Sequence, residues 1–107
     1  MSLGKPVIVT DYSATTEFCN SENSIPIPFT MIPVRRDQID NSAYNDVKEW
    51  ADSDIDAAAQ ALQSLYQSPE LRTRLGSAAR AFIADHFSTG NFRKSVEAFL
   101  AKRTSAK

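Results

Sequence analysis

The side chains best suited to chemistry lie close together in a short polar segment near the start of the chain. Ser13, Thr15 and Thr16 supply hydroxyl groups and Glu17 supplies a carboxylate, soon after a β-branched run. Hydroxyl groups and the unpaired N–H groups at the start of a helix can bind an anion, and the helix dipole favours negative charge there. The same residues can instead act as plain helix caps, and an acid in a first helical turn is favourable without any ligand. The sequence leaves both interpretations open.

Elsewhere the reactive residue types occur singly. Cys19 is the only cysteine and forms no intrachain disulfide, so we expect a small buried apolar side chain. His86 is the only histidine, and without a nucleophile or acid beside it in the sequence we expect it to lie at a helix end. The adjacent Arg35 and Arg36 are expected to be solvated. We therefore expect the chain to contribute no catalytic residue, no metal site and no cofactor.

The composition is that of one small globular domain. The chain has 107 residues, of which 42% are hydrophobic and 23% are charged, and its net charge is −1. Nucleic acid is an unsuitable partner because the basic residues form no continuous stripe. No run of about 18 apolar residues is present, so we expect no spanning membrane segment. The single cysteine indicates a reducing compartment, which makes the cytoplasm the expected location.

The first part of the chain predicts a strand, a short helix and a second strand over residues 1–29. The run from Val7 to Thr10 is typical of a strand buried on both faces. A second strand is expected over residues 24–29, where Pro26 and Pro28 are tolerated at a sheet edge. The thirteen residues between the two strands are about the minimum for a crossover, which favours parallel pairing. An antiparallel hairpin here would contradict this prediction.

The rest of the chain predicts a long ordered loop over residues 30–52 and three helices over residues 53–104, packed on one side. Ser53 and Asp56 could form a capping box for the first helix. Ser68 and the following proline and glutamate predict the start of the second, and Ser88 or Thr89 that of the third. Gly76, inside the second helix, indicates close packing against a neighbour. We expect the core to include Val7, Val9, Ile25, Leu62, Leu65, Leu75, Phe82 and Phe99.

Together these segments form an ordered series of motifs. The series is Gly4-Lys5-Pro6-Val7-Ile8-Val9-Thr10, Glu17, Asn23-Ser24-Ile25-Pro26-Ile27-Pro28, Trp50-Ala51-Asp52-Ser53-Asp54, Ser68-Pro69-Glu70-Leu71-Arg72, Leu75-Gly76, Ala79-Arg80 and His86-Phe87-Ser88. In its order and spacing it resembles the C-terminal part of group 1 glycosyltransferases, which are retaining enzymes of the GT-B fold. The resemblance covers about Gly4 to Leu100.

The resemblance implies an α/β fold class, namely part of a Rossmann-like domain that binds a nucleotide-sugar donor. It implies a two-domain parent enzyme that transfers the sugar to an acceptor with retention, and an acceptor that docks in the cleft between this domain and an N-terminal domain. In the family, two glutamates close in sequence precede the Gly-Lys-Pro strand, and this chain begins after that position. We therefore expect a fragment, inactive alone, in which Met1-Ser2-Leu3 could be an expression leader.

The same resemblance suggests a role for the polar segment. In the family, the position of Ser13 and Ala14 often holds two glycines, followed by a glutamate that matches Glu17. Ser13, Thr15, Thr16 and Glu17 are therefore the candidate residues for binding the donor diphosphate. The substitution of the glycine pair puts in doubt any contact that requires a residue without a Cβ atom.

The sequence allows two functions other than that of a glycosyltransferase fragment, and it predicts a homodimer. The chain could be a non-enzymatic helical module for protein interaction, although a strand–helix–strand start is unusual for such a module. It could also be a complete enzyme, but it has no acid/base pair and no activated nucleophile. Because a cut parallel sheet leaves an open edge and an apolar face, we expect the fragment to self-associate as a homodimer.

Overall fold

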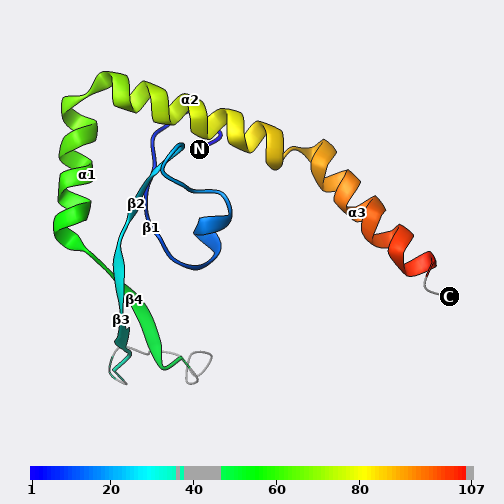
Figure 1. Ribbon diagram of the computed structural model, residues 1–107, viewed down its shortest axis with the longest axis horizontal. Coiled ribbons are helices and arrows are strands. Elements are labelled where there is room, and N and C mark those ends of the chain that lie inside the picture. The colour runs from blue at the N-terminus through cyan, green and yellow to red at the C-terminus, as the bar shows by residue number, and fades with distance from the viewer. Residues whose placement is uncertain (36, 38–46, 106–107) are drawn as a thin grey trace.

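The computed structural model describes residues 1–35, 37 and 47–105, and it shows a mixed α/β chain. In order along the chain, the elements are β1 (Ile8–Thr10), the 3-10 helix η1 (Ser13–Glu17), β2 (Ile25–Ile27), β3 (Phe29–Pro33), β4 (Glu49–Ser53), α1 (Ile55–Gln67), α2 (Pro69–His86) and α3 (Thr89–Thr104). Two strand pairs and a long C-terminal helix define the architecture (Figure 1).

The first strand pair is parallel, as the short crossover predicted. Ile8 lies opposite Ile25 and Thr10 lies opposite Ile27, with η1 in the connection. All three residues of β1 are half-buried. The expectation of a strand buried on both faces was therefore wrong for the described residues, because β2 is the only strand that pairs with β1 among them.

The second strand pair corrects the prediction of a long loop. β3 and β4 pair antiparallel, with Phe29 opposite Ser53 and Pro33 opposite Glu49. β3 is rich in β-branched and aromatic residues, but its partner lies well beyond it along the chain, so the pairing is not visible in either segment alone. Much of the interval between β3 and β4, including Arg36, lies outside the described residues.

The helix starts follow the expected capping chemistry with one correction. Ser68 Oγ accepts a hydrogen bond from Leu71 N at the start of α2, and Ser88 Oγ accepts one from Asn91 N at the start of α3. At α1 the cap is Asp54, whose Oδ1 accepts from Ala57 N at 2.9 Å. The predicted capping box of Ser53 and Asp56 was wrong, because Ser53 is the last residue of β4.

The core lies where α1 packs against α2, β1 and β2. Six apolar residues are buried there or in the connection between the strands, namely Cys19, Ile27, Ala61, Leu65, Leu75 and Ala79. Burial of Cys19, Leu65 and Leu75 confirms those predictions. Val7, Val9, Ile25 and Phe82 are only half-buried.

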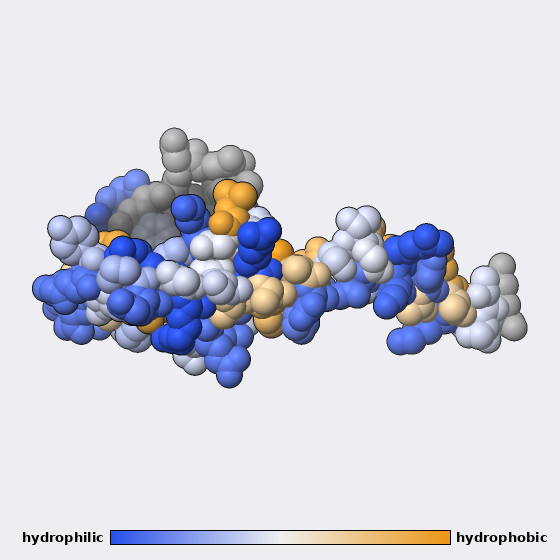
Figure 2. Space-filling view, turned by 90° about the horizontal axis from the view of Figure 1, so that it is seen from above, coloured by the Kyte–Doolittle hydropathy of each residue, from blue (hydrophilic) through white to orange (hydrophobic). Residues whose placement is uncertain are grey.

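Two predicted core residues are exposed. Leu62 is 63% exposed and Phe99 is 59% exposed. Phe99 belongs to α3, which has no buried residue and extends away from the other helices (Figures 1 and 2). The expectation of three helices packed on one side is therefore correct for α1 and α2 and wrong for α3. α1 lies beside α2 and beside both strands of the parallel pair.

Candidate functional site

The predicted site residues lie at the carboxyl edge of the parallel strand pair. Thr10 and Ile27 end β1 and β2 side by side, and Asp11 N donates a hydrogen bond to Ile27 O at 2.9 Å. The chain then turns through Ser13, which has a φ of 59°, into η1. This left-handed backbone conformation is uncommon for a residue with a Cβ atom. We call the residues Thr10, Ser13, Thr15, Thr16, Glu17 and Ser53 the carboxyl-edge cluster.

The two threonine hydroxyls of η1 hold the turn together. Thr15 Oγ1 lies within hydrogen-bonding distance of Tyr12 O, at 2.8 Å, and of Thr10 O, at 3.1 Å. Thr16 Oγ1 donates to Ser13 O at 2.7 Å. A hydroxyl group has one proton, so each threonine donates it to a main-chain carbonyl. Unless these bonds open, an anion at this edge would therefore be bound by main-chain N–H groups and by the exposed Ser13 hydroxyl.

The hydroxyls of Thr15 and Thr16 do not cap the start of η1, as they would if these residues served only as helix caps. Tyr12 occupies the N-cap position of η1, and no side chain there accepts from the helix N–H groups. Ser13, Thr16 and Glu17 are exposed to solvent, whereas Thr15 is half-buried. The structure thus places all four predicted residues in one turn and leaves three of them accessible.

Ser53 is a member of this cluster that the sequence analysis did not identify. Its Oγ lies 2.6 Å from Thr10 Oγ1, although 43 positions separate the two residues along the chain. The contact joins the end of β4 to the end of β1 and so connects the two strand pairs. Nearby, the rings of Tyr12 and Phe29 lie 5.0 Å apart at a tilted angle. No signal in the sequence pairs these segments.

The cluster is suited to binding by hydrogen bonds. Its members are hydroxyl groups and one carboxylate, held on a turn whose backbone is fixed by the threonines. Within the described residues, no group of three or more histidine, cysteine, aspartate or glutamate residues could hold a metal ion. Over the same residues, no helix is both long and apolar enough to cross a membrane.

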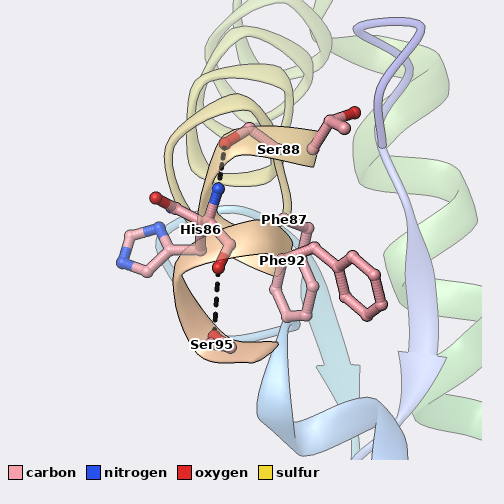
Figure 3. Close-up of a pocket in the computed structure, with 7 residues that line it drawn as sticks. His86, Phe87, Ser88, Phe92 and Ser95 are labelled. Carbon is pink, nitrogen blue, oxygen red and sulfur yellow. Dashed lines mark hydrogen bonds between the residues drawn. The ribbon is translucent and has the colours of Figure 1, made fainter. Parts of the chain in front are cut away.

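A hollow lies at the corner between α2 and α3. Its volume is about 460 Å³, and it is lined by His86, Phe87, Ser88, Thr89, Asn91, Phe92 and Ser95. The rings of Phe87 and Phe92 lie on one side, and His86 points away from them (Figure 3). Ser88 and Ser95 bond to the main chain of Asn91. The corner is therefore shaped chiefly by helix capping and two aromatic rings.

His86 lies in the last turn of α2, as expected. Its Nδ1 is 3.0 Å from Phe82 O, and its ring stacks on that of Phe82 with centroids 4.1 Å apart. These are the contacts of a helix-end residue. Among the other residues considered from sequence, Arg35 forms an exposed ion pair with Asp37 at 3.1 Å.

Comparison with known proteins yielded no match. No protein-family model fits the chain, and searches of curated proteins and of solved structures found nothing similar.

Proposed function

We propose that this chain forms part of the donor-binding, Rossmann-like half of a retaining nucleotide-sugar glycosyltransferase of the GT-B fold. The observation that carries the proposal is the position of Ser13–Glu17 at the carboxyl edge of a parallel strand pair. In open α/β sheets, ligands bind in the crevice beyond the carboxyl ends of the strands. The turn after β1 is therefore where a donor diphosphate would bind.

The backbone of Ser13 supports this assignment. The resemblance to group 1 glycosyltransferases aligns Ser13 with the first residue of a position often occupied by two glycines. Ser13 has a φ of 59°, a conformation that glycine adopts without strain. Because Ser13 adopts the conformation of a glycine, the backbone of the turn can follow the same course as with glycine. The main-chain N–H groups of the turn can then approach a phosphate although Ser13 has a Cβ atom.

In the proposed role, the cluster binds and positions the donor and performs no proton transfer. The main-chain N–H groups of the turn would donate to the diphosphate, while exposed Glu17 would accept hydrogen bonds from donor hydroxyl groups. Thr15 would act indirectly, since its bond to Tyr12 O fixes the turn. The acceptor and the sugar-transfer chemistry would involve parts of a larger enzyme.

The test is a titration of the isotopically labelled chain with uridine, adenosine and guanosine diphosphates, followed by amide NMR shifts. We expect dissociation constants of about 1 mM, equivalent to about −4 kcal/mol, with the largest shifts in residues 11–17. Inorganic phosphate should produce smaller shifts at the same amides. The proposal is wrong if the shifts lie elsewhere or if none occurs at about ten times that concentration.

A matched pair of variants separates specific binding from a general charge effect. Ala14→Asp places a carboxylate in the exposed turn without removing a side-chain contact and should abolish the shifts by like-charge repulsion. Thr73→Asp introduces the same charge on the exposed side of α2 and should leave them unchanged. Equal loss of binding in both variants would contradict the assignment of the site.

A helical protein-interaction module is the second candidate function. The observation that favours it is α3, a 16-residue helix with no buried residue and several exposed large apolar side chains. Such a surface on a helix indicates contact with another protein. The two functions use different parts of the chain, so both can hold.

A further inference from the structure

Two helices expose apolar stripes that no other described part of the chain covers. On α3, the stripe consists of Phe92, Val96, Phe99 and Leu100, which are 40% to 72% exposed. On α1, it consists of Ile55, Leu62 and Tyr66, which are 63% to 86% exposed. Residues at these spacings lie along one face of a helix. We call them the α3 stripe and the α1 stripe.

The two stripes are at opposite ends of the molecule. α2 has 18 residues, which at 1.5 Å per residue is about 27 Å, and it lies between α1 and α3 (Figure 1). α1 already uses another face, which includes Ala61 and Leu65, in the core. As the helices are arranged, the α3 stripe of a chain does not cover the α1 stripe of the same chain.

The charges around the two stripes are complementary. α3 carries four basic residues and one acid, and the acid, Glu97, is paired with Arg93 at 2.8 Å. The segment from Glu49 to Gln67 carries four exposed acids and no basic residue. The acids precede or begin α1, whereas Lys102 and Arg103 lie in the last turn of α3. Attraction between these ends favours antiparallel contact of α3 with α1.

We propose that this surface is the interface of a homodimer, in which the α3 stripe of each copy packs antiparallel on the α1 stripe of the other. A two-fold axis makes the exchange reciprocal, so both stripes of both copies are covered. Antiparallel packing places Phe92 near the partner's Tyr66 and Leu100 near the partner's Ile55. The proposal is independent of nucleotide binding.

The apolar surface is large enough for a stable dimer. An aromatic side chain buries about 150–250 Å² and three of the seven stripe residues are aromatic, so the stripes can bury roughly 700 Å² per copy. A standard protein interface buries about 800 Å² per partner. The lengths also match, since Ile55 to Tyr66 spans about 16 Å and Phe92 to Leu100 spans about 12 Å at the helical rise.

Sedimentation of the full 107-residue chain at tens of micromolar tests the assembly. We expect a dimer that Leu62→Glu or Phe99→Glu weakens at least tenfold. Gln60→Glu and Ala98→Glu add the same charge to the same helices away from the stripes and should change the dissociation constant by less than about threefold, because exposed charges are screened. All four positions are exposed, and circular dichroism verifies that each variant folds.

Several outcomes would overturn the proposal. A monomer at about 100 μM excludes an interface of this size, since it implies a free energy of association weaker than about −5.5 kcal/mol. A dimer that Phe99→Glu disrupts and Leu62→Glu does not would indicate contact between two α3 helices. A dimer insensitive to both substitutions would indicate a different surface, such as a strand edge.

Disulfide trapping tests the orientation in a Cys19→Ala background. A Tyr66→Cys chain mixed with an isotopically labelled Phe92→Cys chain should form a mixed-mass covalent dimer under mild oxidation. The pair Ile55→Cys and Phe92→Cys is the matched control and should crosslink at least tenfold more slowly. Faster crosslinking of the control pair would mean that the helices run parallel, and dominant same-mass dimers would mean that each helix pairs with itself.

Discussion

Gly76 of α2 packs directly against the main chain of Gly4. A Cβ atom added at Gly76 would lie 2.9 Å from the Gly4 carbonyl carbon and closer still to its oxygen, whereas real Cβ atoms essentially never approach within 3.0 Å. Gly4 itself has a φ of 68°, so the segment reaches α2 through a left-handed turn. This contact attaches the start of the chain to the middle of α2 and explains a glycine inside a helix.

The first prediction concerns this contact. Alanine normally stabilises a helix interior by about 1 kcal/mol relative to glycine, but at residue 76 overpacking should reverse the sign and cost about 1–3 kcal/mol. Gly90→Ala in α3 is the control, because an added Cβ would meet only Ser88 Oγ at 3.8 Å. Urea denaturation measures both variants. A more stable Gly76→Ala variant would disprove the close approach.

The second prediction concerns the turn before η1. Ser13 adopts a left-handed backbone that costs a residue with a Cβ atom about 1–2 kcal/mol, so Ser13→Gly should raise the free energy of unfolding by about 1 kcal/mol. Ala14→Gly, one residue further, should lower it by about 0.5–1 kcal/mol because glycine loses more entropy on folding. In thermal and urea unfolding, Ser13→Gly should be more stable than the parent chain and Ala14→Gly less stable. A loss of stability in both variants would contradict the turn geometry.

The third prediction concerns the hydrogen bond between Thr10 and Ser53. A double-mutant cycle of Thr10→Val and Ser53→Ala should give a coupling free energy of about 1 kcal/mol, since the two hydroxyls are 2.6 Å apart. Thr10→Val combined with Ser95→Ala on α3 is the control cycle and should be additive. Additivity in both cycles would show that the two strand pairs are not joined at this point.

The fourth prediction compares Leu62 and Leu75, both of which the helical spacing in the sequence predicted to lie in the core. Leu75 is 1% exposed and Leu62 is 63% exposed. Leu75→Ala should cost about 2–5 kcal/mol through the cavity it leaves, whereas Leu62→Ala should cost less than about 1 kcal/mol in the monomer. Denaturation at low micromolar concentration keeps self-association from contributing. Equal losses would mean that α1 buries a different face.

Local patterns were enough to predict the helices. Ser68 followed by proline and glutamate specifies a helix start by chemistry within a few residues, and α2 begins there. The parallel pairing of β1 and β2 was also predictable, because a crossover of this length limits how two strands can meet. The four candidate binding residues were found together because they are neighbours along the chain.

The sequence alone thus determined the features that depend on short separations. It did not reveal that β3 and β4 pair, that Ser53 bonds to Thr10, or that α3 extends away from the core with Phe99 exposed. Each of these depends on partners far apart in the chain, and an apolar stripe looks the same whether it faces a core or solvent. Only the tertiary structure decided which stripes are buried, because burial depends on where the connecting elements direct each helix.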